Sequence, residues 1–255
     1  MLTLVVTAAN PGTVSGSPDT WVQTTKDDFE AGVLNNVNTS FSPGNVKLAA
    51  KYCYALQGDG QVGFSRYDIA ANSWDTMADT LVNVYYGGSL VYDGTDIYAL
   101  QGNNQETFWR YDIAANSWIA RADIPGPGNV SSGGSLTYDG TYIYALQGNY
   151  TTAFWRYNIA TNLWDTRTPA PNAVGSGGAL TYDGTYIYAL QGDGNNNFWR
   201  YNIATNLWDT RTSTPEIVAD GGALTYDGTY IYALRGNDQT TSDCVKTDMA
   251  ADLST

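Results

Sequence analysis

The chain has 255 residues and a formal net charge of −13, and its 20 Tyr, 8 Trp and 27 Gly favour β-sheets joined by tight turns. The negative charge argues against a nucleic-acid partner or an anionic membrane surface. The sequence contains no His, which removes the commonest general base and zinc ligand and every Ser-His-Asp or Cys-His arrangement.

Residues 1–19 precede the repeats and combine an uncharged stretch of high β propensity with a linker rich in Pro, Gly and Ser. We expect this arm to add a strand to a neighbouring subunit, chiefly through Leu2, Leu4, Val5 and Val6. Folding back on the outer strand of its own sheet is the alternative. No apolar run reaches the roughly 20 residues of a membrane-spanning helix, so no membrane span is predicted.

A repeat of about 44 residues fills most of the remaining chain. Glycines at five positions fall in register, with spacings of 44, 46, 44 and 44 residues: Gly58, Gly102, Gly148, Gly192 and Gly236. A period of this length is typical of a four-stranded propeller blade. The second, third and fourth copies each contain a strand of small residues that ends at Asp-Gly, a segment such as "IYALQG", a segment such as "FWRYDI", and a last strand that contains Trp. The sequence therefore predicts an all-β, five-bladed β-propeller of four-stranded antiparallel blades over residues 20–255.

The repeat resembles the Kelch family over about residues 43–255. "IYALQG" stands where that family has an Ile-Tyr strand that ends in Gly-Gly, and "YDIAANSW" and "YNIATNLW" match its Tyr-Asp…Asn-x-Trp segment. The second glycine of the doublet is replaced by residues such as Asp59 and Asn103, which tolerate a left-handed backbone. The resemblance implies a propeller that pairs its two chain ends within one blade.

The last copy lacks its fourth strand, because Ser254 falls on the position of the repeated Trp. Residues 20–25 resemble residues 207–212, so we expect Trp21, Val22 and Thr24 to supply the missing strand. This arrangement would make the first and last blades neighbours.

The two cysteines replace apolar residues in the first and last blades. If those blades are neighbours, Cys53 and Cys244 can form a disulfide, which would indicate an oxidising compartment. Two unpaired buried thiols are the alternative.

The charged residues that recur in every copy are best explained as structural. We expect the arginines to stack on aromatic rings or to pair with carboxylates between blades. They are Arg66, Arg110, Arg156 and Arg200. No catalytic residue, metal site or cofactor is predicted.

The loops that vary between copies lie on one side of the predicted ring, and function more often resides in such loops. The candidate contact face comprises Phe29, Val33, Leu34, Tyr85 and Tyr86. Possible N-glycosylation acceptors are Asn38, Asn129 and Asn149.

These features favour a non-enzymatic extracellular or cell-surface module. We expect its propeller subunits to be linked into a filament or surface array by the N-terminal arm, so that the main partner is a second copy of the chain. Two alternatives remain open. One is a lectin-like module that binds glycans through the variable loops, and the other is a polysaccharide hydrolase that uses non-repeated carboxylates.

Overall fold

The computed structural model describes residues 3–5, 22–24, 52–126, 129–236 and 244–248. These residues form twenty β-strands and, within those ranges, no helix. The strands assemble into five antiparallel sheets of four strands each. The predicted all-β class with five four-stranded antiparallel sheets is thus confirmed.

The five sheets are numbered here in the order in which they follow one another in space. Sheet 1 contains β1 (Thr3–Val5), β3 (Tyr52–Leu56), β4 (Phe64–Asp68) and β5 (Ser73–Thr76). Sheet 2 contains β6 (Ser89–Tyr92), β7 (Ile97–Leu100), β8 (Phe108–Asp112) and β9 (Ser117–Ala120). Sheet 3 contains β10 (Ser135–Tyr138), β11 (Tyr142–Leu146), β12 (Phe154–Asn158) and β13 (Leu163–Thr166). Sheet 4 contains β14 (Ala179–Tyr182), β15 (Tyr186–Leu190), β16 (Phe198–Asn202) and β17 (Leu207–Thr210). Sheet 5 contains β18 (Ala223–Tyr226), β19 (Tyr230–Leu234), β20 (Cys244–Asp248) and β2 (Val22–Thr24).

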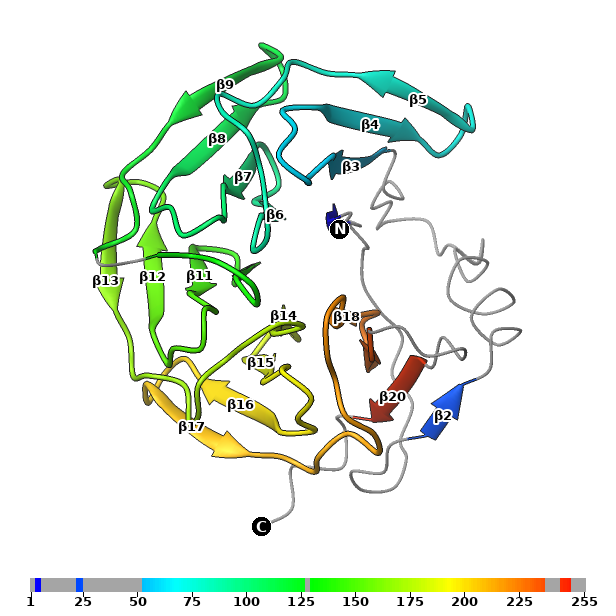
Figure 1. The fold of residues 1–255 in the computed structure, drawn as a ribbon, viewed down its shortest axis with the longest axis vertical. Coiled ribbons are helices and arrows are strands. Elements are labelled where there is room, and N and C mark those ends of the chain that lie inside the picture. Colours follow the sequence, from blue (N-terminus) through cyan, green and yellow to red (C-terminus); the bar gives the residue numbers. More distant parts are fainter. Residues whose placement is uncertain (1–2, 6–21, 25–51, 127–128, 237–243, 249–255) are drawn as a thin grey trace, which may run out of the picture.

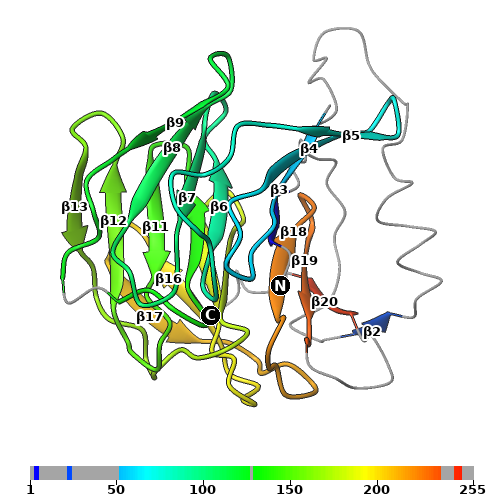
Figure 2. The ribbon, with the colours of Figure 1, turned by 45° about the horizontal axis from the view of Figure 1, so that its top comes forward.

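The sheets are arranged around a common centre (Figure 1). The first strand of each sheet lies nearest the middle, and neighbouring first strands contact one another in the order β1, β6, β10, β14, β18. In the tilted view of Figure 2, β6 to β9 lie side by side from the centre outwards.

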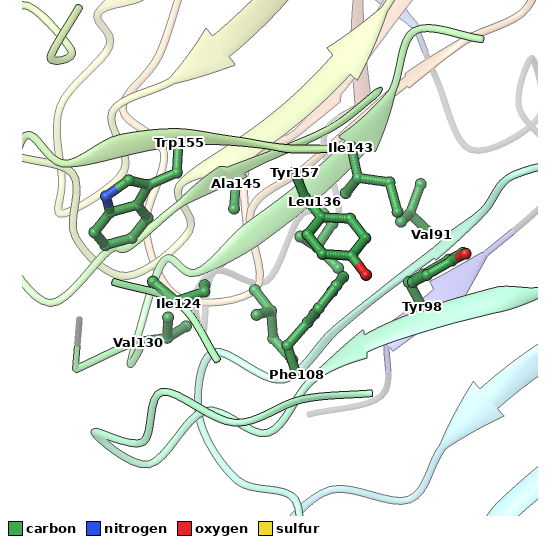
Figure 3. Packing of buried hydrophobic residues seen from close by; sticks show 11 residues of the cluster. Val91, Tyr98, Phe108, Ile124, Val130, Leu136, Ile143, Ala145, Trp155 and Tyr157 are labelled. Atoms are coloured by element: carbon green, nitrogen blue, oxygen red, sulfur yellow. The ribbon is translucent and has the colours of Figure 1, made fainter. Parts of the chain in front are cut away.

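The core lies between adjacent sheets because alternate residues of one strand face opposite neighbours. In β11, Ile143 and Ala145 pack toward sheet 2, whereas Tyr144 and Leu146 pack toward sheet 4, and all four are buried. Figure 3 shows the first of these cores, where the rings of Phe108 and Tyr157 meet edge to face at 4.9 Å. A strand buried on both faces explains the nearly unbroken apolar run in each "IYAL" segment.

A tryptophan and an asparagine of the next sheet bind each of the three loops that connect sheets 1 to 4. The indole N–H of Trp164 donates to the carbonyl oxygen of Ala122 at 2.8 Å. The side-chain oxygen of Asn162 accepts from the Ala122 backbone N–H at 2.9 Å and from the Tyr157 hydroxyl at 2.7 Å. Trp118 and Trp208 repeat the indole contact. The Asn-x-Trp motif is therefore a fastening between sheets.

The N-terminal strand corrects the predicted domain boundaries. Residues 1–19 were expected to lie outside the repeats, but β1 is the inner strand of sheet 1, where Leu4 pairs with Ala55. The reason is visible in the sequence, because residues 3–5 (Thr-Leu-Val) match residues 89–91 (Ser-Leu-Val), the inner strand of sheet 2. Leu2 and Val6 lie outside the described residues.

The second N-terminal strand occupies the place predicted for it. β2 pairs antiparallel with β20 as the outer strand of sheet 5, with Val22 opposite Lys246 and Thr24 opposite Cys244. Trp21 lies outside the described residues. The first 24 residues therefore contribute strands to both the first and the last sheet.

Candidate functional site

The recurrent arginines lie between an aromatic ring and a carboxylate of the same sheet. Arg156 contacts Asp165 through two hydrogen bonds of 3.1 and 2.8 Å, and its guanidinium carbon lies 4.2 Å from the centre of the Tyr142 ring. Arg66 and Arg200 repeat both contacts. The prediction of aromatic stacking and carboxylate pairing is confirmed, although the partners lie within one sheet and not between blades.

Sheet 2 departs from this pattern. Asp96 occupies the position of the stacking tyrosine of sheets 1, 3 and 4, and Ile119 lies opposite Arg110 where those sheets have the paired aspartate. Arg110 therefore pairs with Asp96 at 3.2 Å and with Asp112 at 3.6 Å. Burial raises the pKa of Asp96, whose side chain is 12% exposed, and this effect exceeds the opposing effect of Arg110.

The loops at the Asp-Gly positions form a face that repeats from sheet to sheet. The Asp139 carboxylate accepts hydrogen bonds from the backbone N–H groups of Thr141 and Tyr142, and its counterparts in three other sheets make the same turn. An open depression of about 450 Å³ between sheets 3 and 4 is lined in part by Asp139, Tyr182 and Tyr186. Because the aspartates stabilise the turns, we interpret this face as structural.

Cys53 is a free, buried thiol in the structure, so the predicted disulfide with Cys244 is wrong for this conformation. Cys53 occupies the same position in β3 that Ile143 occupies in β11, and it acts there as a small apolar core residue. Burial raises the pKa of its thiol.

The opposite face is built from the loops that vary between repeats. In each of sheets 1 to 4, the loop between the second and third strands contains three consecutive residues with positive φ, the first of which is a glycine. In sheet 3 they are Gly148, Asn149 and Tyr150, and the backbone N–H groups of Asn149 and Tyr150 donate to the carbonyl oxygens of Ser132 and Val174, both at 2.9 Å. The side chains that vary between repeats are thus carried by turns whose backbone is hydrogen-bonded to the neighbouring loops.

Tyr150 is unusual among these turn residues. It has a φ of 57° and is 61% exposed, whereas the equivalent positions hold Gly60, Asn104 and Gly194. A left-handed backbone at a bulky residue costs about 1–3 kcal/mol.

Two tyrosine rings on this face pack over glycines. In one pair the glycine lies in the turn and the tyrosine in the loop between two sheets, whereas in the other pair the tyrosine lies in the turn and the glycine in the loop. In sheet 1 the turn residue is Gly60, and a Cβ placed there would meet the Tyr85 ring at 2.8 Å. In sheet 3 the turn residue is Tyr150, whose ring lies 3.2 Å from the Cβ position of Gly175. Both arrangements place an aromatic ring at the loop face.

The sequence predicted only part of this face. Tyr86 is 64% exposed and Tyr85 is half-buried, whereas Phe29, Val33 and Leu34 lie outside the described residues. The prediction omitted Tyr150. The available signal was a tyrosine at a position that the other repeats fill with Gly or Asn.

The three possible glycosylation acceptors differ in their surroundings. Asn129 is exposed, and Asn38 lies outside the described residues. The side-chain N–H₂ group of Asn149 donates to the side-chain oxygen of Asn104 at 2.9 Å and to the Asn129 carbonyl oxygen at 3.2 Å. That nitrogen is the atom a glycan would have to modify.

Comparisons with known proteins place the fold but not the family. No protein-family model matches the chain, and no curated protein matches it. The solved structure of YjhT is similar with a TM-score of 0.58 and 13% sequence identity, over 72% of this chain and 69% of that chain. At this identity the likeness concerns the fold alone. In the described part of the chain, no helix is long and apolar enough to cross a membrane.

Proposed function

We propose that the five sheets are the blades of one five-bladed propeller of Kelch-like repeats, closed at sheet 5 by β2. We further propose that the protein is a non-enzymatic structural module outside the cell or at its surface. Copies of the chain would be linked by exchange of the N-terminal strand β1.

The pairing of β1 is the observation that carries this proposal. β1 contributes three residue pairs to the inner edge of sheet 1, and residues 6–21 join it to β2 in sheet 5. A segment of that length can extend to about 50 Å. β1 of a second copy could make the same three pairs, so exchange between copies costs no strand contacts. Such head-to-tail exchange need not close into a ring, and repetition of it would give a filament.

The charged residues support a structural role over catalysis. Arg66, Arg156 and Arg200 are each held by an aspartate and a tyrosine in the same sheet. Groups repeated in this way serve the fold, since catalysis needs a group at one place only. Exposed Asn129, in an Asn-Val-Ser sequon, is compatible with an extracellular location.

Cross-linking tests the exchange directly. In a chain with Cys53→Ala and Cys244→Ala, the pair Leu4→Cys and Ala55→Cys places two thiols opposite each other in β1 and β3. We expect mild oxidation at increasing protein concentration to give a ladder of disulfide-linked oligomers on a non-reducing gel. Disulfides formed only within single chains at every concentration would contradict strand exchange.

A matched control uses the corresponding pair in sheet 4. Leu180→Cys and Ala189→Cys lie opposite each other in β14 and β15, which a short turn connects and which cannot exchange in this way. This variant should form only intrachain disulfides. Deletion of residues 1–17 should also convert any oligomer to a monomer on a sizing column, whereas a glycan-binding module without strand exchange would keep its size.

A further inference from the structure

A continuous arc of aromatic and amide side chains crosses sheets 2 to 4 on the variable loop face. The side chains of Asn104 and Asn149 are hydrogen-bonded across the junction of sheets 2 and 3. Tyr150 adjoins Asn149, and the Asp193 carboxylate lies close enough to Tyr150 to raise the pKa of its hydroxyl. We define the loop-face arc as Tyr86, Asn103, Asn104, Asn149, Tyr150 and Asp193.

The backbone holds the arc in place before any ligand arrives. The N–H of Asn103 donates to the carbonyl oxygen of Tyr86 at 2.9 Å, and the N–H of Asp193 donates to that of Ser176 at 2.7 Å. Each bond joins the turn of one sheet to the loop that enters it. A preorganised surface loses less conformational entropy on binding than a mobile loop does.

Tyr150 indicates that the arc serves a ligand. The fold does not need this ring, because the same turn forms with Gly60, Asn104 and Gly194 in sheets 1, 2 and 4. A strained backbone beneath an exposed aromatic ring is typical of a functional contact. The ring is amphipathic, with an apolar face and a hydroxyl at its edge.

The chemistry of the arc fits a neutral sugar chain. Aromatic faces can pack against the C–H face of a pyranose ring, and asparagine side chains can donate to and accept from its hydroxyl groups. The turns at residues 57–63, 101–107, 147–153 and 191–197 contain no Lys or Arg, and the chain carries a net charge of −13. An anionic ligand would therefore be repelled.

We propose that the loop-face arc binds a neutral oligosaccharide, with Tyr150 and Tyr86 packing against sugar rings and Asn103 and Asn104 bonding to hydroxyl groups. This activity does not depend on exchange of β1. It identifies the variable loops of sheets 2 to 4 as the binding surface.

Titration calorimetry of the full chain with maltohexaose, cellohexaose, xylohexaose and hexa-N-acetylchitohexaose tests the proposal. We expect at least one of them to bind with a dissociation constant on the order of 1 mM or tighter. Tyr150→Asn should weaken that binding at least about tenfold, whereas Tyr150→Phe should change it less than about threefold. Because asparagine tolerates the left-handed backbone, Tyr150→Asn should also leave the unfolding temperature unchanged or raise it.

Leu163→Asn is the matched control, since Leu163 lies in the same sheet and is 64% exposed, but on the outer strand β13. It should bind like the unaltered chain. The proposal is overturned if none of the four oligosaccharides binds, or if Tyr150→Asn binds as tightly as the control. Strand exchange is read out separately by the cross-linked ladder, so failure of one proposal leaves the other standing.

Discussion

The exception in sheet 2 offers a quantitative test of the arginine contacts. Sheets 1, 3 and 4 hold each arginine between a tyrosine and an aspartate, whereas sheet 2 has Asp96 and Ile119 at those two positions. Asp96→Tyr and Ile119→Asp together would restore the common pattern around Arg110. The two single variants and the double variant form a double-mutant cycle.

The expected magnitudes follow from the contacts of Arg110. Asp96→Tyr alone removes the partner at 3.2 Å and leaves Asp112 at 3.6 Å, while the Arg110 side chain is only 28% exposed. Removal of one partner of a buried ion pair costs about 3–5 kcal/mol, and the partial exposure of Arg110 and its remaining partner Asp112 reduce the expected loss to about 1–2 kcal/mol. Ile119→Asp alone adds a third carboxylate at an exposed site and should change stability by less than about 0.5 kcal/mol. The double variant should return to within about 0.5 kcal/mol of the unaltered chain, because the new aspartate and tyrosine both contact Arg110.

Differential scanning calorimetry provides the assay. For a protein of this size, 1 kcal/mol shifts the unfolding temperature by about 2–4 °C. Asp96→Tyr should therefore unfold about 2–8 °C lower, and the double variant should recover most of that loss. Additive effects, with the double variant no more stable than Asp96→Tyr, would refute the idea that the sheets share one set of arginine contacts.

Two further predictions concern packing and pH. Gly177 has a φ of 86°, and a Cβ there would lie 1.9 Å from the Ala219 carbonyl oxygen, whereas Gly184 has a φ of 103° and nothing within 4 Å of its Cβ position. Gly177→Ala should lower the free energy of unfolding by more than about 4 kcal/mol, whereas Gly184→Ala should lower it by about 1–2 kcal/mol. Equal losses would mean that the close approach of Gly177 to Ala219 is absent. Burial raises the pKa of Tyr98, and it raises that of Tyr111 to about 12, above the unfolded value of about 10. The folded state therefore keeps protons that the unfolded state loses, and the unfolding temperature should fall as pH rises above about 10; a constant value in thermal melts from pH 8 to 11 would contradict this.

The sequence was sufficient to predict the sheets because each sheet is encoded locally. The turn at Asp139, the strand Tyr142–Leu146 and the strand Phe154–Asn158 follow one another within one repeat, and each carries its own pattern. All four strands of sheets 2, 3 and 4, and three of the four strands of sheets 1 and 5, are consecutive in the chain. Local patterns of this kind can be compared between copies without knowledge of the fold.

Features that depend on distant parts of the chain were harder to predict. Thr3, Leu4 and Val5 are the inner strand of sheet 1, but β2 and residues 25–51 separate them from β3, so the repeat is interrupted in the sequence. The match of three residues to the inner strand of sheet 2 was too short to be recognised alone. The sequence shows that Cys53 replaces an apolar residue, but it does not show whether the thiol is buried in the core or faces Cys244. The disulfide was therefore predicted, whereas Cys53 is a free, buried thiol. The sequence did not single out Tyr150 because a positive φ is uncommon for tyrosine, so its residue type gives no indication of this backbone conformation.

The central claim is that the N-terminal segment closes the ring by pairing with the last sheet. Thr24 lies opposite Cys244 in the antiparallel pair β2–β20, and directly opposite residues of such a pair are about 4.5–5.5 Å apart at Cα, within the range for a disulfide.

The most direct measurement is the oxidation of a Thr24→Cys, Cys53→Ala chain, followed by peptide mapping and calorimetry. We predict an intrachain disulfide between residues 24 and 244 that raises stability by about 3–5 kcal/mol, a gain absent when Cys244 is also replaced by Ala. Two thiols that stay free under oxidising conditions would contradict closure of the ring by β2.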